Sequence, residues 1–146
     1  MQKEITKNIE NIKNKISGAC ASINKDPKEI TLIAVSKKKS VQMVETALES
    51  GVSSFGENYA QELQEKSSII KSNKIIWHFI GPIQSNKIKI IANNANWVHT
   101  LDKEKVIKKL NLECEHINKT IEACIQVNIS SELSKSGCHP ENLLDI

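Results

Sequence analysis

The regular spacing of short apolar runs is the feature that most restricts the fold of this 146-residue chain. Five such runs begin near residues 31, 53, 75, 97 and 122, so the steps between them are 22, 22, 22 and 25 residues. Each run has the length of a buried strand, and a segment with helical periodicity follows it. Strands that alternate with helices at a steady interval are typical of parallel sheets with right-handed crossovers. An open doubly wound sheet and a (β/α) barrel both satisfy this pattern.

The segment before the first run predicts an amphipathic N-terminal helix that packs on its own domain. Its apolar residues recur at helical steps and form one stripe, which consists of Ile5, Ile9, Ile12, Ile16, Cys20 and Ile23. Ser40 is expected to cap the helix after the first strand, and Asp102 the helix after the fourth. The length and the 39% hydrophobic content fit a single globular domain over residues 1–146.

Composition argues against several classes of function. The net charge of +3 is spread along the chain, with lysines between glutamates, which disfavours a nucleic-acid-binding surface. No apolar run reaches the roughly 18 residues of a membrane span, and no signal peptide is expected. Four cysteines without CxxC spacing disfavour a zinc site and a disulfide framework, so we expect a cytoplasmic protein. No GxGxxG or P-loop motif indicates nucleotide binding.

Lys37 is the leading candidate for chemistry. It directly follows the first apolar run, Thr31 to Ser36, and should therefore lie at the carboxyl edge of the sheet, where α/β proteins bind ligands. A partly shielded lysine at this edge is a candidate nucleophile towards a carbonyl group. The alternative is a lysine that simply leaves the sheet and meets water.

Several motifs together resemble one known family. In order along the chain they are AVSK at 34–37, FGENY at 55–59, WHFIGPIQSNK at 77–87, and QVNI at 126–129 followed by SKSG at 134–137. The chain is similar over nearly its whole length to the pyridoxal phosphate homeostasis proteins, which resemble the isolated barrel domain of alanine racemases. The resemblance implies an α/β fold, a (β/α)₈ TIM barrel of which this chain supplies a part.

The resemblance also implies a cofactor and its contacts. Lys37 would hold pyridoxal 5′-phosphate (PLP) as a Schiff base, and Asn58 would lie against the cofactor at the barrel mouth. His78 is a candidate for the barrel interior beneath the cofactor, or else a hydrogen-bonded core histidine. Lys87 and Lys135 follow other strands at the same edge and are candidates for attracting the phosphate, although exposed loop lysines would look the same.

The function implied is vitamin B6 and amino/keto acid homeostasis by a protein that binds PLP without catalysis, with apo PLP enzymes as possible recipients. Racemases of this fold need a second acid/base, a tyrosine from an added domain, and the single tyrosine here is Tyr59. Two alternatives stay open. One is a Schiff-base enzyme of the amino acid racemase type, and the other is a fragment with little cofactor binding.

The chain length leads to a further expectation. A complete (β/α)₈ barrel takes about 250 residues, whereas this sequence supplies about five βα units. The later loops that usually bind phosphate in such barrels have no counterpart here. We therefore expect a truncated barrel whose first and fifth strands are unpaired edges, with a tendency to self-associate edge to edge.

Overall fold

The computed structural model describes residues 2–132 and 134–146. Within them, one parallel sheet contains β1 (Ile33–Val35), β2 (Ser54–Glu57), β3 (Ile76–Phe79), β4 (Trp97–Leu101) and β5 (Glu122–Ile125). The helices are α1 (Gln2–Ser22), α2 (Val41–Glu49), α3 (Ala60–Ile69), α4 (Ile88–Asn94) and α5 (Glu104–His116), with short 3₁₀ helices η1 (Pro27–Glu29) and η2 (Pro140–Asp145). The five predicted strands are confirmed.

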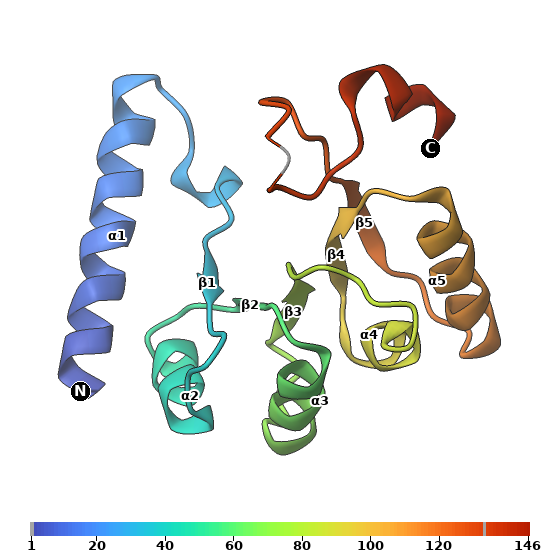
Figure 1. The fold of residues 1–146 in the computed structure, drawn as a ribbon. Helices are drawn as coiled ribbons and strands as arrows, with labels where there is room; N and C mark the ends of the chain where they lie inside the picture. Colours follow the sequence, from blue (N-terminus) through green and yellow to red (C-terminus); the bar gives the residue numbers. More distant parts are fainter. Residues whose placement is uncertain (1, 133) are drawn as a thin grey trace.

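The strand order distinguishes between the two architectures that the strand spacing left open, and it confirms the barrel that the family resemblance implied. The strands follow one another in sequence, β1-β2-β3-β4-β5, without the reversal of order that defines a doubly wound sheet. Figure 1 shows α1 to α5 arranged around one side of the curved sheet, from α1 on the left through α3 at the bottom to α5 on the right. Helices on the outside of a sequentially ordered parallel sheet are the arrangement of a (β/α) barrel, here an open part of one.

The hydrophobic core lies between the sheet and these outer helices. From the sheet it takes Phe55, Trp77, Phe79 and Val98, and the rings of Phe55 and Trp77 meet at a centroid distance of 5.9 Å. The helices contribute mainly aliphatic side chains, among them Val44, Leu63, Ile88, Ile91, Val106 and Leu110. Because few residues are aromatic, interdigitated Ile, Leu, Val and Ala fill most of this layer.

The N-terminal helix α1 packs on the domain through part of its apolar stripe. Ile9 and Cys20 are buried, whereas Ile12 is 43% exposed and Ile23 is 70% exposed. The predicted packing is confirmed for the first two residues. The outer positions of the stripe remain in contact with solvent.

The two predicted helix caps have different outcomes. Ser40 caps α2 by accepting a hydrogen bond from the Met43 amide, as expected. Asp102 does not cap α5, because the N-cap position belongs to Lys103. The Asp102 carboxylate instead accepts a hydrogen bond from the Gly137 amide at 3.3 Å, which ties the loop after β5 to the end of β4.

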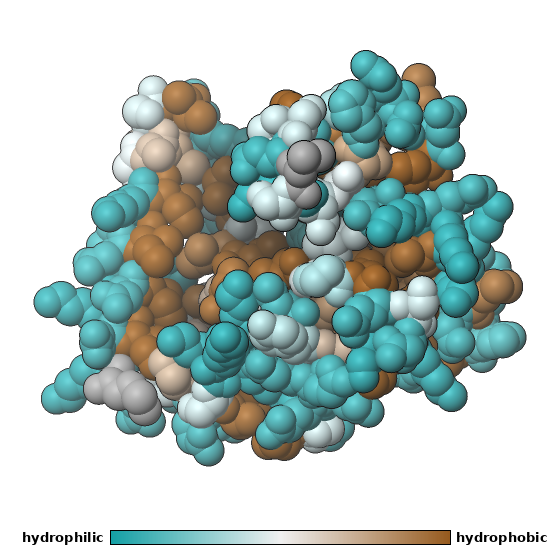
Figure 2. Space-filling model, viewed as in Figure 1, coloured by the Kyte–Doolittle hydropathy of each residue, from teal (hydrophilic) through white to brown (hydrophobic). Residues whose placement is uncertain are grey.

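The inner face of the sheet has no helical layer over it in the part of the chain that the structure describes. Figure 2 shows hydrophobic residues in the recess at the centre of this view. On this face, Val35 and Ile76 are 51% and 39% exposed, and the described residues give β1 and β5 one pairing neighbour each. None of the described helices is both long and apolar enough to pass through a bilayer.

Candidate functional site

Lys37 lies where the first strand ends, as predicted. The parallel ladder continues one residue beyond β1, because the Ser36 amide donates to the Gly56 carbonyl at 2.9 Å. Lys37 and Lys38 then occupy the centre of a turn closed by the Lys39 amide and the Ser36 carbonyl at 3.0 Å. The side chain of Lys37 is exposed rather than partly shielded. It is therefore accessible to a solute at the carboxyl edge of the sheet.

The sheet register shows which residues lie beside Lys37. Val35 pairs with Gly56, Gly56 with His78, and His78 with Trp97. Lys37, Asn58 and Ile80 follow the carboxyl ends of β1, β2 and β3. The parallel pairing of these strands thus places an amine and an amide beyond the same edge of the sheet.

Asn58 and Lys87 are brought together by the two loops that follow β2 and β3. Both line a small pocket of about 120 Å³, together with Tyr59, Pro82 and Gln84. Asn58 and Lys87 are each partly buried, and Lys87 occupies the position before the first turn of α4. The pocket thus places an amide and an amine in one small hollow formed by the loops after β2 and β3.

His78 is buried, at 4% exposure, and forms a pair with His99 on the neighbouring strand. Its Nδ1 lies 2.9 Å from His99 Nε2, and its ring stacks on Trp97 at a centroid distance of 5.9 Å. Its Nε2 is buried and has no hydrogen-bond partner among the described residues. Burial, with a smaller contribution from His99, lowers the pKa of His78 from 6.5 to about 4, and burial also lowers the pKa of His99. Both imidazoles are thus neutral at physiological pH.

Lys135 follows a strand that is not a neighbour of β1, β2 or β3, after which the other candidates lie. It follows β5, which is at the opposite edge of the sheet from β1. The loop that carries it folds back on itself, because the Asn128 amide donates to the Cys138 carbonyl and the Cys138 amide to the Gln126 carbonyl, both at 2.9 Å. Lys135 itself is exposed in this loop.

A buried polar cluster beneath Lys37 was not predicted from the sequence. The Lys66 ammonium, on α3, donates to Glu57 Oε1 at 2.7 Å, to the Ser36 carbonyl at 2.7 Å and to Glu62 Oε2 at 2.9 Å. The Ser36 hydroxyl also donates to Glu57 Oε1, at 2.6 Å. Glu57 and Lys66 are 0% and 4% exposed, so this ion pair is shielded from water. The sequence gives one indication of this burial. Glu57 stands two residues after Phe55 in a strand, and Lys66 stands three residues after Leu63 in a helix, so each charge lies on the same face as an apolar residue.

Glu62 connects this cluster to the Lys37 turn. Its Oε2 accepts a hydrogen bond from the Lys38 amide at 2.7 Å as well as from Lys66. Burial alone would raise the pKa of Glu62, but the hydrogen bonds from Lys66 and Lys38, with the charges of the two lysines, outweigh it and hold the pKa below 4.5. Glu62 is therefore a carboxylate at neutral pH and binds the turn as an anion.

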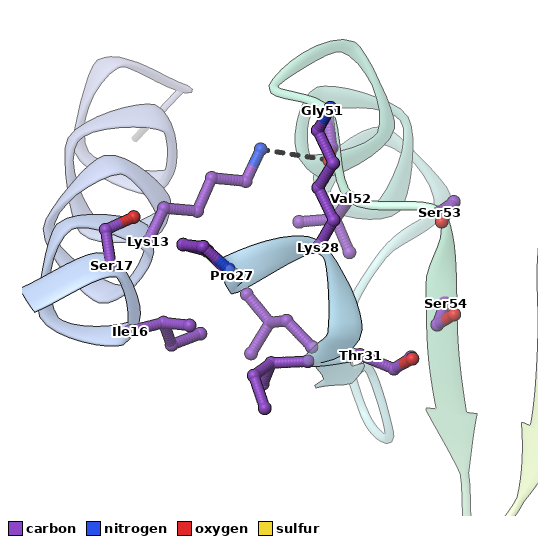
Figure 3. A pocket seen from close by; sticks show the side chains of 12 residues that line it. Lys13, Ile16, Ser17, Pro27, Lys28, Thr31, Gly51, Val52, Ser53 and Ser54 are labelled. Carbon is purple, nitrogen blue, oxygen red and sulfur yellow. Dashed lines mark hydrogen bonds between the residues drawn. The ribbon is translucent and has the colours of Figure 1, made fainter. Parts of the chain in front are cut away.

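A separate hollow lies at the other end of the strands. It has a volume of about 490 Å³ and lies between α1 and the segments that precede β1 and β2 (Figure 3). Beside it, the Lys13 ammonium donates to the carbonyls of Ser50 and Gly51 at 3.0 and 2.9 Å. These carbonyls directly follow the last turn of α2, so Lys13 caps this helix end. Ligand sites in barrels occur at the opposite, carboxyl end.

The Asn58 loop is held by close contact with Gly81. A Cβ added to Gly81 would lie 2.0 Å from the Asn58 carbonyl oxygen, so close that the two atoms would clash. We expect Gly81→Ala to lower the free energy of unfolding by about 1–3 kcal/mol, because backbone must move to admit the methyl group. Gly18→Ala is the matched control, since nothing lies within 4 Å of its Cβ and alanine favours the α1 helix. Urea unfolding measures both variants, and equal stabilities would contradict this close contact.

The chain is similar to proteins of known family. A family model described as alanine racemase, N-terminal domain, matches residues 2–146. A pyridoxal phosphate homeostasis protein of Pasteurella multocida is 40% identical over 144 residues, which are 97% of this chain and 62% of that protein. The protein of the same name from Escherichia coli K12 is 39% identical over 137 residues, covering 92% of this chain and 58% of that one. The chain therefore spans about 60% of the length of these relatives.

Solved structures show the same fold. The crystal structure of an unknown protein from Bifidobacterium adolescentis has a TM-score of 0.86 at 24% identity, over 99% of this chain and 62% of that one. PipY of Synechococcus elongatus, with PLP bound, has a TM-score of 0.74 at 28% identity, over 88% of this chain and 60% of that one. The resemblance inferred from the motifs is confirmed. The match over residues 2–146 shows that this chain belongs to the alanine racemase N-terminal domain family.

Proposed function

We propose that this chain binds PLP through Lys37, without catalysis, and takes part in vitamin B6 and amino/keto acid homeostasis. The observation that carries the proposal is an exposed lysine at the carboxyl end of β1, in a turn that buried groups hold in place. The name of the relatives and the PLP in PipY support the choice of cofactor. In this proposal, residues 1–146 form a single domain, the N-terminal part of a PLP-binding barrel.

The residues present fit this cofactor in two respects. PLP supplies an aldehyde, with which an amine condenses to form a C=N bond with loss of water. The amine of Lys37 is exposed, and it has no ion-pair or hydrogen-bond partner among residues 2–132 and 134–146. Asn58 supplies a donor and an acceptor for a polar ring substituent, and Lys87 in the same small pocket supplies a positive charge for an anionic one. Lys135 is a more distant second cation.

The test is a covalent map of the PLP site. The chain is mixed with PLP, reduced with borohydride and digested, and the label is located by mass spectrometry. We expect the label on Lys37, and its loss in Lys37→Arg, because the guanidinium group does not condense with the aldehyde. Lys39→Arg is the matched control, two residues away and also exposed. A label spread evenly over surface lysines would contradict the proposal and favour a chain with little specific binding.

The non-catalytic part of the proposal has its own test. A Schiff-base enzyme of the racemase type would convert amino acids in the presence of PLP, and this turnover would disappear in Lys37→Ala. We expect no such turnover from the chain with PLP bound. Racemase or transaminase activity that depends on Lys37 would contradict the proposal and show that the chain is an enzyme.

The proposal extends to location and partners. The four cysteines are free, which fits a reducing, cytoplasmic location. Apo PLP enzymes are the proposed recipients of the cofactor. Because β1 and β5 each pair on one side in the described chain, a second copy is proposed to pair at these edges. Sedimentation over a concentration series tests this self-association.

A further inference from the structure

The turn that carries Lys37 is held on both sides of that residue by α3. On the N-terminal side, the Ser36 carbonyl accepts a hydrogen bond from the Lys66 ammonium at 2.7 Å. On the C-terminal side, the Lys38 amide donates to Glu62 Oε2 at 2.7 Å. Lys66 and Glu62 are themselves joined at 2.9 Å. The two peptide groups that flank Lys37 are therefore fixed to one ion pair on a neighbouring helix.

The hydrogen-bonding capacity of Lys66 is fully used in this arrangement. An ammonium group has three donors, and Lys66 directs them at Ser36, Glu57 and Glu62. Glu57, at the end of β2, anchors the ion pair in the buried layer. A buried ammonium group with all three donors used has few alternative positions. The cluster is thus a rigid support that reaches the turn from α3 and β2.

The conformation of the turn needs such a support. Lys38 has φ of +59°, in the left-handed region that is unfavourable for a residue with a side chain. The bond from its amide to the Glu62 carboxylate is charge-assisted, and such bonds are stronger than those between neutral groups. The Glu62 carboxylate thus stabilises the turn in the form seen here.

We propose that Glu62 and Lys66 are positioning residues that fix the turn bearing Lys37, so that its amine is held ready at the carboxyl edge of the sheet. The inference rests on the proposed function, since it assigns the reason for this rigidity to PLP binding by Lys37. Neither residue bonds to the side chain of Lys37. They act on its amine through the backbone on either side, and a reacting group held in place condenses faster than one that must be ordered.

The experiment compares Glu62→Ala with Glu65→Ala. Both changes remove one negative charge from α3, but the exposed Glu65 side chain has no bond to the turn. The first readout is hydrogen exchange of the Lys38 amide by NMR. We expect exchange roughly tenfold or more faster in Glu62→Ala, from the loss of the charge-assisted bond, and no change in Glu65→Ala. Equal exchange in the two variants would overturn the positioning role.

The second readout is PLP binding, followed by titration and by borohydride labelling. We expect the apparent Kd of Glu62→Ala to rise about tenfold, since small losses of alignment weaken reactions strongly, whereas Glu65→Ala binds like the parent. Glu62→Gln keeps an acceptor for the Lys38 amide and should recover part of the affinity. Labelling of Lys37 in Glu62→Ala at the parental rate would also overturn the inference. Failure of the parent itself to label Lys37 would contradict the proposed function, while amide exchange would still decide whether Glu62 fixes the turn.

Discussion

Lys66→Met should lower the free energy of unfolding by about 3–5 kcal/mol, the usual cost of removing one partner from a buried ion pair. Methionine keeps much of the length of the side chain but cannot donate. The Glu57 carboxylate, at 0% exposure, would keep only the Ser36 hydroxyl on Oε1, and its Oε2 already lacks a partner in the described chain. The Ser36 carbonyl would lose its Lys66 donor as well. Urea unfolding followed by circular dichroism measures the loss.

Two further variants distinguish the effect of an unpaired buried charge on stability from the effect of losing any lysine. Lys108→Met removes a lysine whose pair with Glu104 is largely exposed, with 71% and 60% of the two side chains accessible. Exposed pairs contribute little, so this change should stay within about 0.5–1 kcal/mol. Glu57→Gln/Lys66→Met leaves no unpaired buried charge and should recover roughly half or more of the loss. A double variant as unstable as the sum of its single changes would show that the two side chains do not interact.

The sequence predicted the β/α alternation well because each strand is specified locally. A short apolar run and the helical periodicity after it are both visible within about 22 residues, and all five strands formed where these runs occur. The choice between barrel and doubly wound sheet was not local. It depends on which strands pair, and no single run carries that information. The family resemblance implied the barrel, and the sequential pairing of the strands confirms it.

The sequence predicted the site residues that belong to motifs. It did not predict the contacts between residues that are brought together only by the register of the strands. Lys37 and Asn58 follow their strands as expected. His78 and His99 were 21 residues apart in the sequence, and only the pairing of β3 with β4 makes them neighbours. His78 is a buried, hydrogen-bonded histidine, as one of its two alternatives had it, and its place beneath the cofactor stays a prediction. The prediction that Asp102 caps α5 was wrong, because its carboxylate accepts a hydrogen bond from the Gly137 amide, 35 residues further along the chain.

The stability of the chain should depend on pH through His78. The pKa of this imidazole is about 4 in the folded chain, against 6.5 for a free histidine. As the pH falls below 6.5, the unfolded chain takes up a proton that the folded chain refuses until about pH 4. Unfolding is then favoured, and the free energy of unfolding should fall by about 3 kcal/mol between pH 6.5 and 4 from this group alone. Above pH 6.5 the effect disappears.

The measurement is urea unfolding at a series of pH values between 7.5 and 4 for the parent and for His78→Phe. Phenylalanine retains an aromatic ring beside Trp97 and does not titrate, so the variant should lose most of this pH dependence. The carboxylates are the same in both chains, and the difference between the two curves therefore reports His78 together with its effect on the neighbouring His99. His116→Gln, at an exposed position near the end of α5, controls for the loss of a histidine and should follow the parent. Parallel curves for the parent and His78→Phe would mean that the folded imidazole accepts a proton as easily as the unfolded one. The burial of His78 and its position 2.9 Å from His99 make this unfavourable.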